Sequence, residues 1–346
     1  MAYPHFAPTV LWNLPLPSEL GINKPAGVFA FSQDDKLLVT LHDGQGGILW
    51  DLTANSSPRK IEFDKNDACL KQSVKAAAMI GVSLGLIVAF GTDHPAQHYN
   101  ILDEDSGLKA SPSNTVLPAA TDVGVSRDGK VATFTTGTTV EVWDALTLHK
   151  TRVLTSEVPI NGPFERVAIS QDNNYTAAVN SQGKLSAWGL TDDFHKVSRN
   201  EEVGVGIGNG WSATNIGLNK TFVMAVLRKR GSADGDAWML VTWGYKYEGP
   251  ENTLYGHEYP KCALACVAPN AEFNITLSTS GSLSGKDSVL CRIFGSGQGV
   301  SKKGKILSCG ISGSSKMLAA ARTNGRLTVW RLYTTEPDPS KRYPAY

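Results

Sequence analysis

The sequence predicts an all-β protein that repeats one small antiparallel sheet along the chain. Three observations lead to this fold class. Short apolar strands end on an aromatic residue at regular intervals, and an alternating strand, polar turn and second strand precede most of these endings. The 34 glycines and 17 prolines are scattered between the apolar runs, as expected when many strands are joined by many turns.

The strand endings form a series because most of them are tryptophans in similar surroundings, as in "GGILWDL" (46–52) and "GRLTVWRL" (325–332). Leu102 and Phe294 fill two gaps in the series. Neighbouring positions are 36 to 55 residues apart, about 47 on average, which is close to the period of propeller blades. The series therefore has seven positions, of which the tryptophans are Trp50, Trp143, Trp188, Trp243 and Trp330.

A second recurrent element lies about 25 residues before most of these endings. Asp, Asn and Gly in its turn tolerate left-handed backbone and supply side-chain hydrogen bonds. Each unit is therefore predicted to run as strand a, turn, strand b, turn, strand c with the aromatic at its end, and a more variable strand d. The clearest examples are residues 27–41, 122–136, 166–180, 264–278 and 309–323.

This organisation resembles the WD40-repeat family of β-propellers along nearly the whole chain. The Trp-Asp ending of that family stands at Trp50-Asp51 and Trp143-Asp144, and its Gly-His signature stands at Gly256-His257. The resemblance implies a seven-bladed β-propeller of four-stranded antiparallel blades. An eight-bladed ring or an unrelated propeller family is the alternative.

The aromatic residues are expected to have a structural role, since a large side chain at the end of strand c fills the wedge between adjacent blades. The resemblance also implies a hydrogen-bond network that joins a His before strand a, a Ser or Thr on strand b, the strand-c Trp, and an Asp in the turn from b to c. In the sixth unit these would be His257, Ser278 or Ser280, and Asp287. Phe294 has no indole N–H, so only the His-Asp half of the network is expected there.

Closure of the propeller requires one more strand, because the last unit has no strand d after Trp330. Residues 8–14, "PTVLWNL", are apolar enough to supply it, and we expect them to pair beside residues 326–332. Residues 1–335 are accordingly predicted as a single WD40-like propeller, with residues 336–346 as a Pro-rich C-terminal tail.

Composition and charge favour an intracellular protein, cytoplasmic or nuclear. The 33 Lys and Arg balance 32 Asp and Glu, so no global charge points to nucleic acid or to a membrane surface. The N-terminal residues lack the pattern of a secretory signal, and no apolar run is long enough to predict a membrane span. The five cysteines are interpreted as buried free thiols in a reducing compartment: Cys69, Cys262, Cys266, Cys291 and Cys309.

No pattern of catalytic or metal-binding residues emerges. His94 and His98 have the spacing of metal ligands on a helix, but Pro95 and their place in the turn from b to c predict a loop, which only Asp93 could complete. The Gly-rich run 203–210 is followed by further strands and not by the helix of a phosphate-binding loop. We therefore expect a protein that is not an enzyme and has no cofactor or metal.

Polar loops are the strongest candidates for binding. In a propeller the turns from d to a and from b to c lie on one face. That face would gather the insertion 228–237, the turn 255–261 and the loop 278–287. The predicted partner-binding residues are Arg228, Lys229, Arg230, Tyr255 and Tyr259. An ordinary set of solvated turns is the alternative.

The leading functional hypothesis is a non-catalytic scaffold that holds other protein subunits in a eukaryotic multi-subunit complex. One alternative is an RNA-contacting subunit of a ribonucleoprotein assembly, such as a ribosome-biogenesis particle, that also uses a basic strand d at 296–306 with Lys302, Lys303 and Lys305. The other alternative is a propeller enzyme or small-ligand binder, which clustered His, Asp or Glu side chains in the central channel would favour.

Overall fold

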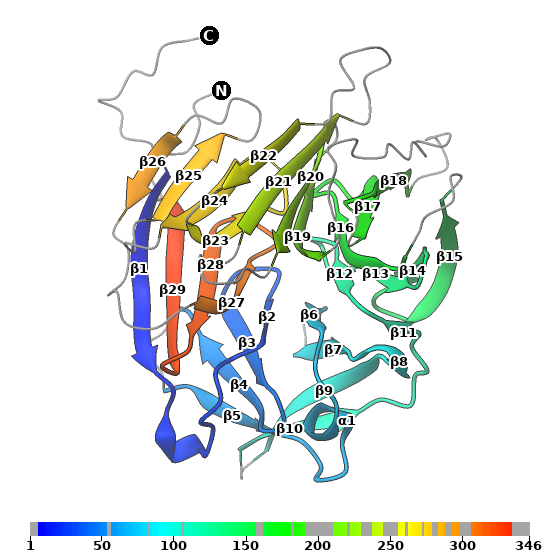
Figure 1. Ribbon diagram of the computed structural model, residues 1–346. Coiled ribbons are helices and arrows are strands. Elements are labelled where there is room, and N and C mark those ends of the chain that lie inside the picture. The colour runs from blue at the N-terminus through cyan, green and yellow to red at the C-terminus, as the bar shows by residue number, and fades with distance from the viewer. Residues whose placement is uncertain are drawn as a thin grey trace.

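The protein is nearly all-β and consists of small antiparallel sheets (Figure 1). Its described helices are α1 (Ala68–Lys71) and the single 3-10 turn η1 (Ser18–Leu20). No helix in the described part of the chain has the length and apolar character needed to cross a membrane. The computed structural model describes residues 6–53, 57–81, 84–104, 107–156, 162–180, 183–190, 210–219, 222–229, 237–244, 255–259, 262–271, 273–278, 283–287, 293–297 and 306–333.

Two antiparallel sets of four strands in the first third of the chain are joined into one eight-stranded sheet. Their outer strands pair in parallel, with Leu108 opposite Ile61, and an ion pair of 2.7 Å from Arg59 Nη1 to Asp103 Oδ2 supports the junction. The fourth strand of each set thus covers the otherwise unpaired backbone edge of the other set. The first set is β2 (Val28–Phe31), β3 (Leu37–His42), β4 (Gly46–Asp51) and β5 (Arg59–Glu62), and the second is β6 (Ala76–Ile80), β7 (Gly85–Ala89), β9 (Gln97–Glu104) and β10 (Gly107–Pro112).

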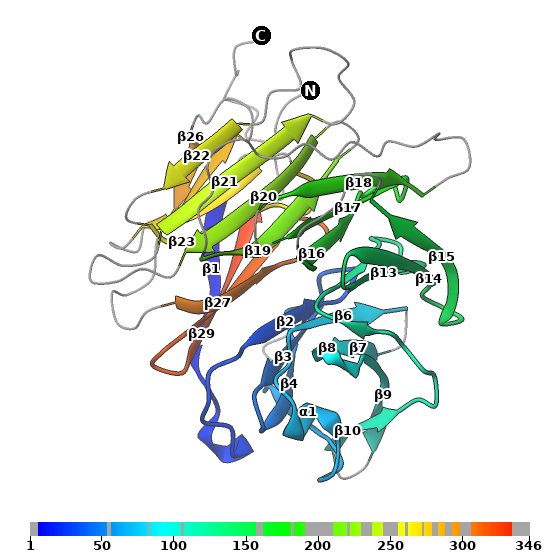
Figure 2. The ribbon, with the colours of Figure 1, turned by 45° about the vertical axis from the view of Figure 1, so that its right-hand side comes forward.

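The middle of the chain continues this pattern with one sheet after another (Figure 2). A short pair, β8 (Gly91–Pro95) with β11 (Ala119–Ala120), comes first. Two sheets follow: β12 (Val123–Val125), β13 (Val131–Thr136), β14 (Thr139–Asp144) and β15 (His149–Thr155), then β16 (Phe164–Ile169), β17 (Tyr175–Asn180) and β18 (Leu185–Gly189).

Two more four-stranded sheets complete this series. In both, the strands pair in the order of the sequence. They are β19 (Trp211–Leu218), β20 (Phe222–Lys229), β21 (Ala237–Gly244) and β22 (Tyr255–Tyr259), then β23 (Cys262–Val267), β24 (Phe273–Ser278), β25 (Leu283–Asp287) and β26 (Ile293–Gly297).

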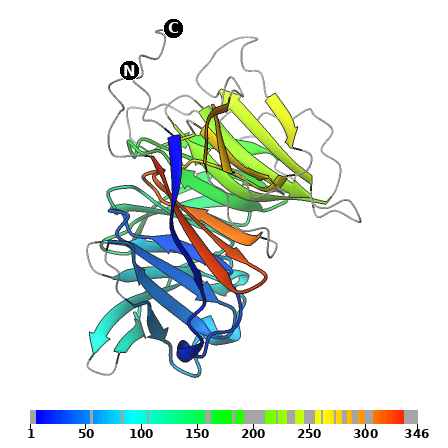
Figure 3. The ribbon, with the colours of Figure 1, turned by 90° about the vertical axis from the view of Figure 1, so that its left-hand side faces the viewer.

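The last sheet contains strands from both ends of the chain. β1 (Phe6–Pro15) lies antiparallel to β29 (Arg326–Tyr333), which is followed in the sheet by β28 (Met317–Arg322) and β27 (Ile306–Ile311). Val10 stands opposite Trp330 and Leu14 opposite Leu327, so residues 8–14 pair where the sequence predicts (Figure 3). The expected tail, 336–346, lies outside the described residues.

The hydrophobic core is divided into wedges between neighbouring sheets. Five of six apolar clusters contain buried side chains from at least two sheets, and the sixth joins the two sets of the eight-stranded sheet. The cluster around Trp50, for example, joins Leu38 of β3 to Met317 of β28. Trp12 of β1 extends that cluster, with its ring centroid 6.0 Å from the ring of Trp50. Stability therefore depends on contacts between sheets as much as on pairing within them.

The turns from a to b share one side-chain motif. In each of four turns a serine begins the turn, its hydroxyl accepts the N–H of the residue five positions later, and it bonds the side chain two positions later. Asp35 and Asn173, with φ of 60° and 59°, take the left-handed position. The predicted role of Asp and Asn in these turns is confirmed. The serines and their partners are Ser32 with Asp34, Ser126 with Asp128, Ser170 with Asp172, and Ser312 with Ser314.

Phe294 does not end the third strand of the sixth unit, as the sequence series predicts. It lies on β26, the fourth strand, whereas the third strand is β25. In the other sheets the aromatic residue faces the second residue of strand b, as Trp50 faces Leu38. The corresponding position here is Lys286, which faces Asn274. The prediction was wrong because the series was aligned on large side chains, whereas pairing places a lysine in this register.

Leu102 is a second correction. It lies on β9, the third strand of its set, but its side chain is 46% exposed. Tyr99 faces Leu86, the second residue of β7, and is fully buried. Tyr99 therefore occupies the position of the tryptophans, and Leu102 points away from it.

Candidate functional site

In the Trp-Asp endings the two adjacent side chains have different structural roles. Trp50 is fully buried and Trp143 is 8% exposed, both between sheets. Asp51 Oδ1 accepts the backbone N–H of Thr53 at 2.9 Å. Asp144 Oδ1 accepts the corresponding bonds in its own turn, and these bonds hold the pKa of the Asp144 carboxyl below its usual value. Successive strand side chains point to opposite faces, so the indole can enter the core while the carboxylate holds the next turn.

The other strand-ending tryptophans lie in comparable places. Trp188 Nε1 donates to the carbonyl oxygen of Thr155 at 3.1 Å and so ties its strand to β15 of the preceding sheet. Trp330 is fully buried, between its own sheet and the one before it. Trp243 stands opposite Val223 in β20, and its side chain lies outside the described part.

A hydrogen-bond network of His, Thr and Trp is present in the first sheet. Trp50 Nε1 donates to Thr40 Oγ1 at 3.0 Å, and Thr40 Oγ1 bonds His42 Nε2 at 3.0 Å. His42 Nδ1 bonds the backbone carbonyl of Lys24 at 2.8 Å, where the family pattern would place an Asp. Burial lowers the pKa of His42, so the ring is neutral at pH 7.

The network expected in the sixth unit is not arranged as the sequence suggested. His257 lies within β22, opposite Leu240, and therefore on the fourth strand of the fifth unit and not in the turn before strand a. Asp287 ends β25 opposite Phe273, in the register of Asp51, and is not in the turn from b to c. A signal for the real network was present in "VTLHD" (39–43), where Thr40 and His42 share one strand face.

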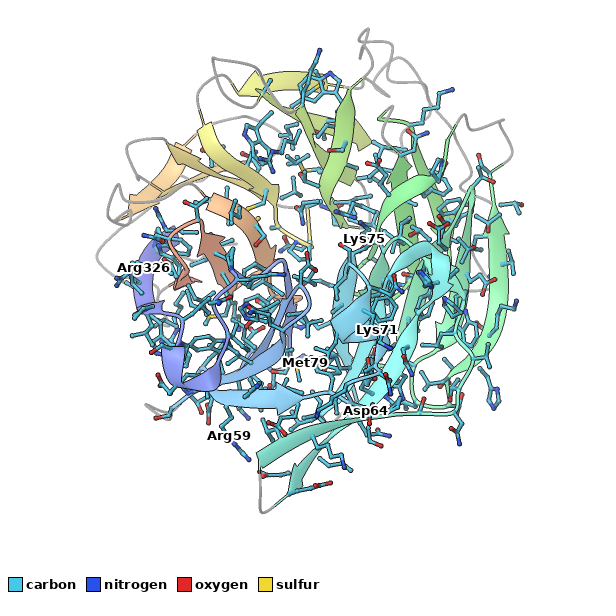
Figure 4. All side chains as sticks on the ribbon, turned by 60° about the horizontal axis from the view of Figure 1, so that its bottom comes forward. Arg59, Asp64, Lys71, Lys75, Met79 and Arg326 are labelled. Atoms are coloured by element: carbon cyan, nitrogen blue, oxygen red, sulfur yellow. The ribbon has the colours of Figure 1, made fainter. Side chains whose placement is uncertain are left out.

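The innermost strands line a pocket, the central channel, with a volume of about 310 Å³. Figure 4 shows Lys75 and Met79 beside the central opening, with Arg59 and Arg326 at the periphery. Small and apolar residues form most of the wall. Among the described residues that line it, Asp122 is the single acidic side chain and there is no histidine, whereas the cations are Lys75, Arg127 and Arg166.

Three polar side chains of the innermost strands, one of them just before its strand begins, accept hydrogen bonds from backbone N–H groups of the next sheet. Asp122 Oδ2 accepts the N–H of Val167 at 2.8 Å, and burial raises the pKa of this carboxyl to about 6. Glu165 Oε2 accepts the N–H of Ala213 at 2.6 Å, and Asn215 Oδ1 accepts that of Val267 at 2.6 Å. Because these acceptors satisfy N–H groups of neighbouring sheets, they hold the sheets together.

Two side-chain hydrogen bonds link neighbouring elements at the end of the channel where the turns from a to b lie. Gln171 Nε2 donates to the carbonyl oxygen of Gly313 at 3.4 Å and so links two turns that are 142 residues apart. Gln33 Nε2 donates to the carbonyl oxygen of Met79 at 2.5 Å in the same region.

The structure brings only part of the predicted partner-binding set together. Arg228 faces Trp238 across β20 and β21, and Trp238 faces Tyr259 across β21 and β22. The Arg228 guanidinium lies over the Trp238 ring, 5.2 Å from its centroid. Tyr255 precedes Tyr259 by four residues on β22 and faces Thr242, so it lies away from this row. Sequence reasoning missed Trp238 because it stands inside a strand and not in the polar insertion.

The loops predicted around this row are shorter than expected. Residues 255–259 are strand β22 and not a turn, and residues 283–287 are strand β25 and not part of the loop 278–287. Lys229 is exposed at the end of β20. Arg230 lies outside the described residues.

Comparison of the chain with models of known protein families and with curated proteins finds no match.

The minor candidates do not form a site in the described part of the chain. His94 is exposed on β8, which is a strand and not the expected loop, and His98 is buried on β9. Within the described ranges, no three His, Cys, Asp or Glu side chains are placed to hold a metal ion. Cys69 and Cys266 are buried and Cys309 is half-buried, and none of the three forms a disulfide. Residues 203–209, Lys302, Lys303 and Lys305 lie outside the described residues.

Proposed function

We propose that the chain is a non-catalytic interaction scaffold, a closed seven-bladed propeller of the WD40 type that holds other protein subunits of an intracellular complex. The observation that carries this proposal is the row of Arg228, Trp238 and Tyr259 across the outer three strands of one sheet. Trp238 is 4% exposed and packs in the core, so the accessible part of the row is half-buried Arg228 over its ring, beside exposed Lys229. Arg is among the side chains most enriched among binding hot spots of protein interfaces.

The packing between sheets supports a closed ring. The six apolar clusters together link every sheet to the next, including the last sheet to the first through Trp50 and Val329. Two glycines show how closely innermost strands approach. A Cβ on Gly217 would lie 2.1 Å from the carbonyl oxygen of Ala268, and one on Gly310 would lie 2.7 Å from Cβ of Phe29. Such contacts favour a rigid body, which suits a scaffold because loops on a rigid framework bind without a large ordering cost.

The composition of the channel wall argues against the enzyme alternative. Acid–base or metal-assisted catalysis needs titratable groups that converge on one point. Among the described lining residues, Asp122 is the single carboxylate, and its Oδ2 is already bonded to the N–H of Val167. The wall therefore offers no second carboxylate and no histidine to work with Asp122 in that part of the chain.

The experiment is affinity purification of the full chain from its native cells, followed by identification of partners by mass spectrometry. Arg228→Glu with Lys229→Glu should reduce the recovery of one reproducible set of partners. The matched control is Lys60→Glu with Lys109→Glu, because these lysines lie on the outer strands β5 and β10, away from the row. Equal recovery with both double variants would contradict the choice of surface.

The RNA-contacting alternative is distinguished from the scaffold function by the salt dependence of its binding affinity. Binding dominated by phosphate contacts weakens steeply as ionic strength rises. If an RNA copurifies, its affinity for the purified chain should fall by orders of magnitude between low and physiological salt. Affinity that stays constant would exclude the RNA-contacting function through basic segments such as 296–306.

A further inference from the structure

The central channel has more cationic than anionic side chains on its wall. Lys75, Arg127 and Arg166 line it, and Asp122 is the single acidic lining residue in the described ranges. The Asp122 carboxylate is compensated locally, because it accepts the N–H of Val167 and lies within the electrostatic influence of Arg166. A concave surface with excess positive charge and low-dielectric walls concentrates anions.

Arg166 is held in place without losing its charge. Its Nε donates to the carbonyl oxygen of Thr214 at 3.2 Å, and its Nη1 donates to that of Glu165 at 2.7 Å. Both acceptors are backbone oxygens, and the carboxyl groups of Asp122 and Glu165 interact electrostatically with the guanidinium, so two of the three lining cations remain without such a neighbour on the same described strands. Its Nη2 donates to no side chain or carbonyl in the described part of the structure. A fixed guanidinium fork loses little entropy when it binds an oxyanion.

Lys75 lies at the same end of the channel as Arg166. Lys75 immediately precedes β6, and Arg166 is the third residue of β16, so both stand near the beginning of an innermost strand. At the opposite end Gln171 is bonded to Gly313. Lys75 is exposed, and Figure 4 shows it beside the central opening. One end of the pocket thus carries two cations.

We propose that this pocket binds a small phosphate-bearing anion, which Lys75 and Arg166 hold at the end of the channel where the innermost strands begin. The volume of about 310 Å³ is at the lower limit for small-molecule pockets, so the ligand is a small molecule and not a polymer. A planar guanidinium beside an ammonium group is a common arrangement for phosphate oxygens. The inference goes beyond the scaffold function and does not depend on it.

The test is calorimetric titration of the full chain with sodium pyrophosphate and with inorganic phosphate at low ionic strength. We expect saturable binding at one site with pyrophosphate, together with a higher midpoint of thermal unfolding that sodium chloride at equal ionic strength does not reproduce. Lys75→Glu should weaken the affinity by about tenfold or more, because it replaces an attractive charge with a repulsive one. Lys75→Arg should keep the affinity within about threefold of the parent value.

The matched control is Lys109→Glu, an exposed lysine on the outer strand β10 that changes the net charge by the same amount. It should leave the affinity for pyrophosphate unchanged. Absence of saturable binding to the parent chain, or equal weakening by Lys75→Glu and Lys109→Glu, would overturn the proposal. Partner recovery with Lys75→Glu should match that of the parent chain, so failure of the pocket and failure of the scaffold function give different results.

Discussion

Trp50 Nε1 donates a hydrogen bond of 3.0 Å to Thr40 Oγ1, and both side chains are fully buried. The bond joins strands β3 and β4 and, through His42, reaches the loop at Lys24. Three polar groups are therefore satisfied inside an apolar wedge, where each would otherwise cost free energy.

Thr40→Val should lower the free energy of unfolding by about 1–3 kcal/mol, because it leaves the buried indole N–H of Trp50 without its acceptor. Urea unfolding followed by tryptophan fluorescence measures this change. The matched control is Thr133→Val on β13, which is also fully buried but has a hydroxyl that makes only a long contact of 3.5 Å to Gly124. An equal loss in both variants would show that the network adds nothing specific.

Asp122→Asn should stabilise the protein at pH 7, by up to about 3 kcal/mol, because the buried carboxyl has a pKa raised from 3.8 to about 6. A raised folded-state pKa contributes stability that is complete below the unfolded value of 3.8 and is lost as pH rises through about 6. The asparagine oxygen can still accept the N–H of Val167. The gain should therefore shrink toward pH 4 in parallel urea titrations.

Asp122→Ala provides the contrast, since it removes both the charge and the acceptor. It should lower the free energy of unfolding by about 1–3 kcal/mol at pH 4, where the parent carboxyl is largely neutral. If the Asn and Ala variants behave alike at both pH values, the bond from Val167 N–H does not hold the two sheets together.

His98 should contribute a loss of stability as pH drops below about 6.5, opposite in sign to the contribution of Asp122, because burial lowers the pKa of His98 in the folded protein. The unfolded state then binds the proton first, so protonation favours unfolding between the unfolded value of 6.5 and the lower folded value. His98→Gln should reduce this loss when unfolding is compared at pH 7.5 and 5.5. His42 has a pKa lowered in the same direction and would keep a residual loss in that variant.

Removal of residues 1–15 should destabilise the protein and promote aggregation, because it leaves the backbone edge of β29 unpaired. Trp12→Ala tests the same strand without deleting its backbone. We expect a loss of about 2 kcal/mol from the contact between Trp12 and Trp50, with no aggregation. Thermal unfolding and light scattering distinguish the two effects. A truncated chain that stays monomeric with an unchanged unfolding midpoint would contradict a closing role for β1.

Much of the fold could be predicted because its signals are local. The alternation in "GVFAFSQDDKLLVTL" (27–41) and its polar turn correspond to β2 and β3, with Ser32 and Asp34 in the turn. The Asp at the end of strand c also acts locally, since Asp51 bonds the backbone two residues away. Such features need only the neighbouring residues to form.

The candidate site could be predicted only in part. Arg228 was found from its place in a basic insertion, but its partner Trp238 is defined by pairing between β20 and β21. Tyr255 was grouped with Tyr259, yet the two residues stand at opposite ends of strand β22. A single sequence does not contain the register of neighbouring strands, and a change of one residue in register moves a side chain to the other face.

The sequence by itself determined that the chain forms repeated antiparallel sheets and where most of the strands lie, because alternation and turn residues act over a few positions. The pairing of the first strand with the last also agrees with the prediction. Only the tertiary structure decided that Lys286 and Tyr99 take the places of tryptophans, that the His network forms around Trp50, and that cations line the channel. These features depend on which side chains of distant segments meet, and packing between sheets sets that.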